Sequence, residues 1–178
     1  MKTYTLKVAG LERDLPILPV NESLSIAAFV MFSDVELTVA CAGELLKKVG
    51  DFDVILTAES KGIPLAFELA RQSGKTYVVG RKSVKLYMSD PISVNVKSIT
   101  TLGVQTLYLS KEDAEKLRGK KVLIADDVIS TGESLTALEK LCEETGGIIA
   151  CRSAVLAEGE AAERDDIVFL EKLPLFPQ

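Results

Sequence analysis

The stretch VLIADDVISTGES, from Val122 to Ser134, carries more information about the fold than any other part of this sequence. Four apolar residues lead into two adjacent carboxylates, Asp126 and Asp127, and a Thr-Gly turn then precedes a helical pattern. A continuous apolar run of this length is typical of a strand buried on both faces of a parallel sheet. Two charges at the end of a buried strand are costly unless something bound there compensates them. The stretch therefore predicts a central strand and a candidate binding site at its end.

Strands and helices alternate on both sides of this stretch. The patterns predict strands over 53–58, 75–80, 121–126, 148–157 and 167–172, and helices over 35–49, 64–73 and 135–145. The N-terminal residues alternate in polarity around Ala9-Gly10, which predicts a hairpin or two short strands. Residues 86–109 lack a helical period, which indicates an antiparallel hairpin outside the parallel sheet. Together these features predict an α/β fold, with a parallel β-sheet core flanked by helices.

Composition limits the classes of protein that fit. The chain has 178 residues, of which 47% are hydrophobic and 26% charged, as in an ordinary globular domain. No apolar run approaches the roughly 20 residues of a membrane span, and residues 1–10 lack the pattern of a secretory signal. We therefore expect one cytoplasmic domain over 1–178, with no membrane partner. The formal charge of −5 argues against a nucleic-acid surface, which needs a basic balance.

Residue types that are rare or missing narrow the chemistry further. The sequence contains no histidine, which excludes histidine general bases, histidine zinc sites and the Ser-His and Cys-His nucleophile systems. Cys41, Cys142 and Cys151 have neither close pairing nor metal-ligand spacing, so we expect small buried hydrophobic side chains. Any chemistry must use carboxylates, lysine, arginine, hydroxyls, backbone amides or a metal that arrives with a ligand.

The carboxyl ends of strands are where open α/β sheets bind ligands, and polar residues concentrate at three of them. After the strand over 121–126, the amides and hydroxyls of 130–134 could surround a phosphate, and Gly132 permits close approach. Asp126 and Asp127 could accept hydrogen bonds from the two neighbouring hydroxyls of a ribose. The alternative reading is a strand that ends in solvated carboxylates.

The other two polar strand ends are weaker signals by themselves. Residues 59–62, with the sequence ESKG, lie between a strand and the start of a helix, where amides and the Lys61 ammonium face an anion. Arg81, Lys82 and Lys85 form a basic cluster just past the strand over 75–80. Ordinary exposed loops are the alternative for both.

The string ADDVISTGES after a hydrophobic run resembles the phosphoribosyl pyrophosphate signature of the type I phosphoribosyltransferases. The ESKG loop is similar to the family's pyrophosphate loop, which in several members contains a non-proline cis peptide. The RKSVK segment resembles the basic segment of adenine phosphoribosyltransferases, and Gly103, Thr106 and Leu107 match the loop and strand that follow. The resemblance covers about residues 53–146 and is closest to the adenine enzymes of the purine branch.

The resemblance implies a role for each of these residues. Catalytic roles would fall to Asp126, Asp127, Lys61 and Arg81; phosphoribose binding to Asp126, Asp127, Ser130, Thr131, Gly132, Glu133 and Ser134; pyrophosphate binding to Glu59, Ser60, Lys61, Gly62, Arg81, Lys82 and Lys85. Base recognition would fall to a hood over about residues 1–34 and to the loop after Leu156. Its candidates are Phe29, Phe32 and Glu158, with core packing the alternative for the two phenylalanines. Residues 86–109 would form a flexible hairpin that closes over the site.

The implied reaction moves 5-phosphoribose from phosphoribosyl pyrophosphate to a purine, with an oxocarbenium-like transition state. Mg²⁺ would arrive with the substrate phosphates and use no direct protein ligand. A homodimer is the habit of the family.

Four departures from the family pattern bear on the substrate. Thr101-Leu102 replaces the Glu-Tyr of many adenine enzymes, and Glu133 replaces a common glycine, so its carboxylate must point away from the phosphate. Ser130 stands where hypoxanthine-guanine enzymes have an acid, and Gly159 where the xanthine type has a lysine, which favours an adenine-like base. The alternatives are a regulatory protein that binds phosphoribosyl pyrophosphate without turnover, and an enzyme for xanthine, orotate or uracil.

Overall fold

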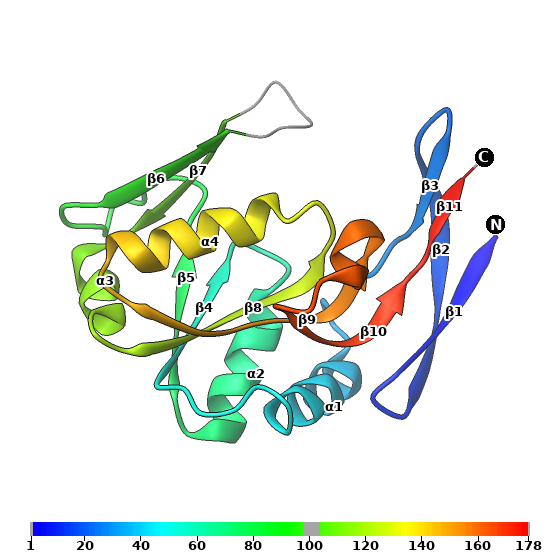
Figure 1. The fold of residues 1–178 in the computed structure, drawn as a ribbon, viewed down its shortest axis with the longest axis horizontal. Coiled ribbons are helices and arrows are strands. Elements are labelled where there is room, and N and C mark those ends of the chain that lie inside the picture. The colour runs from blue at the N-terminus through cyan, green and yellow to red at the C-terminus, as the bar shows by residue number, and fades with distance from the viewer. Residues whose placement is uncertain (1, 98–103, 178) are drawn as a thin grey trace.

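The computed structural model describes residues 2–97 and 104–177. A central five-stranded sheet has helices on both faces, and a separate four-stranded sheet, which we call the hood, stands beside it (Figure 1). The hood consists of β1 (Thr3–Val8), β2 (Leu11–Asn21), β3 (Leu24–Ala27) and β11 (Leu175–Pro177). The central sheet consists of β4 (Val54–Ala58), β5 (Thr76–Gly80), β8 (Lys121–Ile129), β9 (Ile148–Glu158) and β10 (Val168–Leu173). The predicted α/β fold with a parallel core is confirmed.

The remaining elements connect and cover the central sheet. They are α1 (Val35–Leu46), α2 (Ile63–Ser73), the antiparallel pair β6 (Ile92–Lys97) and β7 (Val104–Leu109), α3 (Lys111–Leu117), α4 (Glu133–Glu144) and the 3-10 helix η1 (Gly159–Glu163). In Figure 1, α1 and α2 lie on one side of the sheet, and α4 lies on the other. None of the helices within the described ranges is long and apolar enough to cross a membrane.

The order of strands in the central sheet is β10-β9-β8-β4-β5, with all neighbours parallel. From β4 the chain moves outward to β5, and from β8 it moves the other way to β9 and β10. The gap between β4 and β8 is therefore the topological switch point, where ligands bind in open α/β sheets. Pairing of β4 with β8 ends at Leu56 and Ile124, whereas β8 stays paired with β9 as far as Ile129. Beyond Ile124 the two central strands part, and this opens space at their carboxyl ends.

Local sequence explains why α2 begins and ends where it does. Pro64 occupies the first turn, where its missing N–H costs no helical hydrogen bond. Gly74 ends the helix in the left-handed conformation, with φ of 70°, which glycine adopts without strain. This places the start of α2 directly after the polar loop that follows β4.

Three parts of the fold differ from the sequence prediction. The strand predicted over 121–126 continues through both aspartates to Ile129, because its pairing with β9 does not stop at the charges. The short helix α3 was not predicted. The hood gains β3 and β11, which pair with each other although some 150 residues of chain separate them.

Candidate active site

A cavity of about 400 Å³ opens at the switch point between β4 and β8. Its lining comes from the loop after β4, the end of β5, the end of β8 and the start of α4: Ala58, Glu59, Ser60, Lys61, Lys82, Asp126, Asp127, Val128 and Ser134. Seven of these nine residues were site candidates in the sequence. The fold thus brings residues from strand β8 and from the loops after β4 and β5 around one space large enough for a phosphorylated sugar.

The two aspartates of β8 reach this cavity from consecutive positions of the strand. Asp127 is buried, with 3% of its surface exposed, and Asp126 is partly buried. Asp126 Oδ1 accepts a hydrogen bond of 2.9 Å from the backbone N–H of Asp127. Burial raises the pKa of Asp126 above the ordinary range of a carboxyl group, and the adjacent Asp127 carboxylate raises it further. The pair therefore shares negative charge in a confined space that a hydroxyl or a cation would relieve.

Lys61 is the cation nearest to this pair. Its Nζ lies 3.1 Å from Asp127 Oδ2, and about half of the lysine side chain is exposed. The same Oδ2 accepts no hydrogen bond from the described residues. Lys61 thus balances the charge of Asp127, while the oxygen keeps its hydrogen-bonding capacity for a ligand.

Gly62 allows the loop after β4 to approach β8 this closely. A Cβ at this position would clash with Thr57 Oγ1 and lie 3.0 Å from Asp126 Oδ1. Thr57 was not a candidate in the sequence, although its buried hydroxyl accepts or donates no hydrogen bond within the described ranges. The signal that could have identified it is a polar residue in the otherwise apolar run VILTA. The peptide bond between Glu59 and Ser60 is cis, as in the loop that this segment resembles.

Glu59 holds the basic segment in place rather than facing the cavity with a free charge. Its carboxylate accepts hydrogen bonds of 2.9 Å from Arg81 Nε and 2.8 Å from the Lys82 backbone N–H. These bonds lower the pKa of Glu59, the backbone bond from Lys82 most strongly. Arg81 also exchanges two backbone hydrogen bonds with Tyr108 of β7. The end of β5 is therefore fixed from both sides, and Lys82 faces the cavity.

Lys85 lies at the margin of this basic cluster. Its Nζ donates a hydrogen bond of 2.7 Å to Ser83 Oγ and lies 4.0 Å from Glu59 Oε1. It does not line the cavity. Its assignment to pyrophosphate binding stays a prediction.

The turn between β8 and α4 carries the predicted phosphate cradle. Gly132 has φ of 80°, a left-handed conformation that favours glycine, and α4 begins at the next residue. The Glu133 N–H points toward Thr131 Oγ1 at 3.5 Å. Ser130 Oγ donates a hydrogen bond of 2.9 Å to Glu158 Oε2 on the neighbouring strand β9. The turn is thus tied to β9 through Ser130, and α4 begins directly after Gly132.

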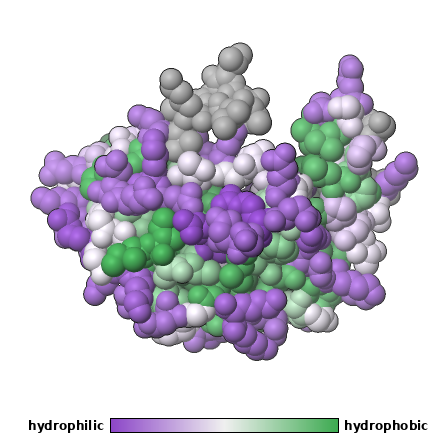
Figure 2. Space-filling model, in the orientation of Figure 1, coloured by the Kyte–Doolittle hydropathy of each residue, from purple (hydrophilic) through white to green (hydrophobic). Residues whose placement is uncertain are grey.

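A second cavity, of about 620 Å³, lies between this turn and the hood. The hood contributes Val20, Leu24, Ile26 and Leu175, and the opposite wall consists of Ser130, Thr131, Glu133, Glu158, Gly159 and Glu160. In Figure 2 the hood carries hydrophobic residues on the side that faces the rest of the molecule. One wall is therefore apolar and the other rich in carboxylates.

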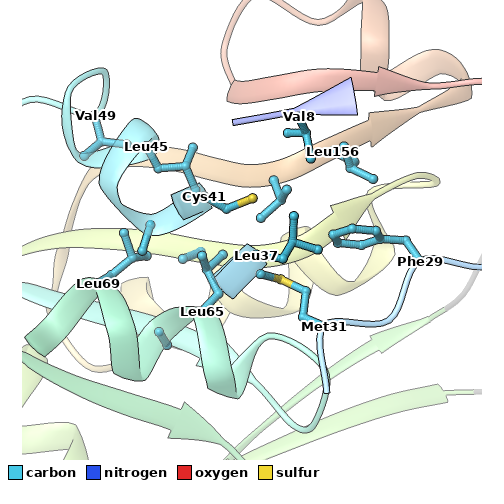
Figure 3. Close-up of a cluster of buried hydrophobic side chains, with 14 of the residues drawn as sticks. Val8, Phe29, Met31, Leu37, Cys41, Leu45, Val49, Leu65, Leu69 and Leu156 are labelled. Atoms are coloured by element: carbon cyan, nitrogen blue, oxygen red, sulfur yellow. The ribbon is translucent and has the colours of Figure 1, made fainter. Parts of the chain in front are cut away.

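The three candidates for base recognition lie in different surroundings. Phe29 is 3% exposed and packs in the core near Met31 and Leu37 (Figure 3). This burial supports core packing, the alternative that the sequence offered for Phe29. Phe32 is 47% exposed but lines neither cavity, whereas Glu158 lines the second one. The loop at Thr101, Leu102 and Gly103 lies outside the described residues.

A family model, the phosphoribosyl transferase domain, matches residues 38–173. The chain belongs to the phosphoribosyltransferase family. The resemblance found in the sequence, to the purine branch of the type I enzymes, is confirmed by the relatives and the fold.

Three curated relatives show the range of the family near this chain. An adenine phosphoribosyltransferase of Acetivibrio thermocellus is 31% identical over 140 residues, which are 77% of this chain and 79% of that protein. A hypoxanthine/guanine phosphoribosyltransferase of Methanothermococcus okinawensis is 36% identical over 118 residues, 65% of this chain and 61% of that protein. The purine biosynthesis transcriptional repressor PurR of Bacillus subtilis is 31% identical over 113 residues, 64% of this chain and 39% of the repressor.

Solved structures support the fold. The crystal structure of an adenine phosphoribosyltransferase from Thermoanaerobacter pseudethanolicus superposes with a TM-score of 0.74 at 23% identity, over 89% of this chain and 95% of that one.

Proposed function

We propose that the protein transfers 5-phosphoribose from phosphoribosyl pyrophosphate to a purine base, with adenine favoured, and releases pyrophosphate. The observation that carries this proposal is the cavity at the switch point, which is lined by buried Asp127, partly buried Asp126, Lys61 and Lys82. Carboxylates suit the ribose hydroxyls, and the lysines suit the leaving pyrophosphate.

The residues around the cavity can stabilise both charges that form in the reaction. As the bond to pyrophosphate breaks, the ribose gains positive charge, and the aspartate pair places negative charge beside it. Lys61 and Lys82 stabilise the negative charge on the departing pyrophosphate, and Arg81 adds a further positive charge next to Lys82. Because Glu59 anchors Arg81 and the Lys82 backbone, these cations are in position before the substrate binds.

Mg²⁺ fits the donor set of this cavity. Asp127 Oδ2 is a carboxylate oxygen that accepts no hydrogen bond from the described residues, and oxygen ligands are those Mg²⁺ prefers. We propose that the ion would enter with the pyrophosphate and that Asp126 and Asp127 would help to hold it. When bound, it neutralises charge on the leaving group.

Charge in the second cavity supports adenine over other bases. Each ionisable side chain found to line it belongs to a glutamate: Glu133, Glu158 and Glu160. Orotate carries a carboxylate, and xanthine, guanine and hypoxanthine carry carbonyl oxygens that need a donor. Adenine has an amino group and no carbonyl oxygen, so carboxylates repel it least. The apolar wall of the hood would cover its ring.

A panel of bases tests the proposal. The protein is incubated with phosphoribosyl pyrophosphate, Mg²⁺ and each of adenine, guanine, hypoxanthine, xanthine, orotate and uracil, and pyrophosphate release is followed. We expect release with adenine at the highest kcat/KM. Release with xanthine or orotate above adenine would overturn the base preference, and binding without release for every base would overturn the enzyme.

A regulatory protein that binds phosphoribosyl pyrophosphate without turnover is the second candidate. It is favoured by the similarity to the PurR repressor and by Thr101-Leu102 in place of a loop carboxylate. The same panel separates it from the enzyme, since it predicts binding with no release.

We also propose that a second copy of the chain covers the outer face of α1 and α2. Val35, Val39 and Phe67 are 73%, 40% and 53% exposed there, and they line one cavity together. Clustered apolar exposure of this kind is typical of an interaction surface. Sedimentation equilibrium is expected to give a dimer, and Phe67→Glu to give a monomer.

A further inference from the structure

Arg164 lies at the turn that begins α4, although nothing in the sequence pattern drew attention to it. It follows η1, after β9, and thus comes from a different segment than the turn. A Cβ placed on Gly132 would lie 3.3 Å from Arg164 Nη1, so the guanidinium packs directly against the turn. Because Gly132 has no side chain, both the guanidinium and a ligand can approach its backbone.

Asp166 fixes the orientation of this guanidinium. Arg164 Nε donates to Asp166 Oδ1 at 2.8 Å, and Nη2 donates to Oδ2 at 2.7 Å. This bidentate pair uses two of the three guanidinium nitrogens and holds the plane of the group. The third nitrogen, Nη1, is the one at Gly132. Asp166 therefore holds the arginine with Nη1 at the turn and outside the bidentate pair.

A phosphate at this turn needs a cation beside it. Helix amides of the first turn have no intrahelical partners, and the first helical bond here runs from the Thr136 N–H to the Gly132 carbonyl, at 2.9 Å. These amides favour an anion, but Glu133, Glu158 and Glu160 line the cavity beside the turn. Their negative charges oppose a phosphate dianion over the few ångströms involved. Lys61 and Lys82 belong to the other cavity, so neither offsets this repulsion at close range.

We infer that Arg164, oriented by Asp166, binds the 5′-phosphate of the phosphoribosyl ligand together with the amides of the β8–α4 turn. The inference rests on the proposed function, because it assigns a ligand group to the turn. It adds a binding residue from outside the signature of residues 122–134.

The affinities of two ligands, one with a 5′-phosphate and one without it, isolate the contribution of this group to binding. Phosphoribosyl pyrophosphate carries it and inorganic pyrophosphate does not, so calorimetric titrations of both, with Mg²⁺, report on the turn and on the Lys61 side separately. The variants are Arg164→Gln, Arg164→Lys and Asp166→Asn. Arg118→Gln is the control, because Arg118 is also an arginine in an ion pair, with Glu115 on α3, and lies away from the turn.

Arg164→Gln is expected to raise the Kd for phosphoribosyl pyrophosphate about tenfold, the scale of a charge-assisted hydrogen bond. The Kd for pyrophosphate is expected to stay within twofold. Arg164→Lys should lose less affinity than Arg164→Gln, because it keeps a positive charge. Asp166→Asn should give an intermediate loss, because the Arg164 guanidinium keeps its charge but is no longer held in one orientation. Arg118→Gln should change neither constant.

Three results would overturn the inference: an unchanged Kd for phosphoribosyl pyrophosphate in Arg164→Gln, an equal loss for both ligands, or the same loss in Arg118→Gln. If Arg164→Gln fails to fold, an unchanged Kd in Asp166→Asn has the same consequence. Failure of the proposed function is distinct, since the wild-type protein would then bind no phosphoribosyl pyrophosphate.

Discussion

The carboxyl edge of the central sheet and the hood present two different surfaces to the space between them. At the sheet edge, charged residues from three loops are fixed by hydrogen bonds and ion pairs before any ligand binds. The hood contributes aliphatic side chains and, within the described residues that line the second cavity, no charge. Under the proposed function, phosphates and a ribose would bind at the edge, and the face of a flat base would bind at the hood.

We expect the largest effect on stability from a substitution at Phe29, in the segment that joins the hood to α1. Phe29→Ala is expected to cost about 3–5 kcal/mol of unfolding free energy, because a buried ring leaves a cavity. Phe32→Ala, at an exposed position, should change stability by no more than about 0.5 kcal/mol. Denaturant unfolding measures both. A Phe29→Ala variant of normal stability that had lost affinity for the base would restore the stacking role that the structure argues against.

At the sheet edge, the next prediction concerns the close approach of the loop after β4 to Asp126 on β8. Gly62→Ala should reduce kcat/KM about a hundredfold, because the added methyl pushes the loop away from Asp126 and misplaces the reacting groups. Gly43→Ala on α1 is the matched control: its Cβ would meet only the flexible end of Gln72, at 3.3 Å. The control should keep its activity and gain up to about 1 kcal/mol of stability from helix propensity. Equal activity in the two variants would contradict a tightly built loop.

The smallest expected effect is that of the Asp126 carboxylate on the free energy of unfolding, and this effect depends on pH. The raised pKa of Asp126 means that its ionised form is less favourable in the folded than in the unfolded chain. Its destabilising contribution is therefore absent below the unfolded pKa, near 4, and grows as pH rises toward the folded pKa. Asp126→Asn should stabilise the protein by about 1 kcal/mol at neutral pH, or about 2–4 °C in Tm, and by nothing measurable near pH 4. A gain that is the same at both pH values would mean that charge is not its cause.

The sheet edge could be predicted from sequence far better than the hood. The run into Asp126 and Asp127, the ESKG loop and the RKSVK segment are local signals, and the order of elements places them at one edge. The hood depends on β11 pairing with β3 across nearly the whole chain, and no local pattern encodes such a contact.

Other features of the structure were not predicted from the sequence for different physical reasons. The helix α3 did carry a signal, since Ser110 caps the Asp113 N–H at 3.1 Å, but only two of its seven residues are buried. The continuation of β8 through its aspartates depends on pairing with β9, which offsets the charges within the strand. The place of Arg164 depends on the return of the chain after β9, which the sequence does not reveal.

The most direct test of the central claim, that the aspartate pair and Lys61 form a phosphoribosyl pyrophosphate site, is a calorimetric titration of this ligand with Mg²⁺ into the wild-type protein and Asp127→Asn. We predict binding to the wild type and a loss of about 1 to 3 kcal/mol in the variant, the scale of a hydrogen bond to a charged group. An unchanged affinity in Asp127→Asn, or no binding to the wild type, would contradict the account.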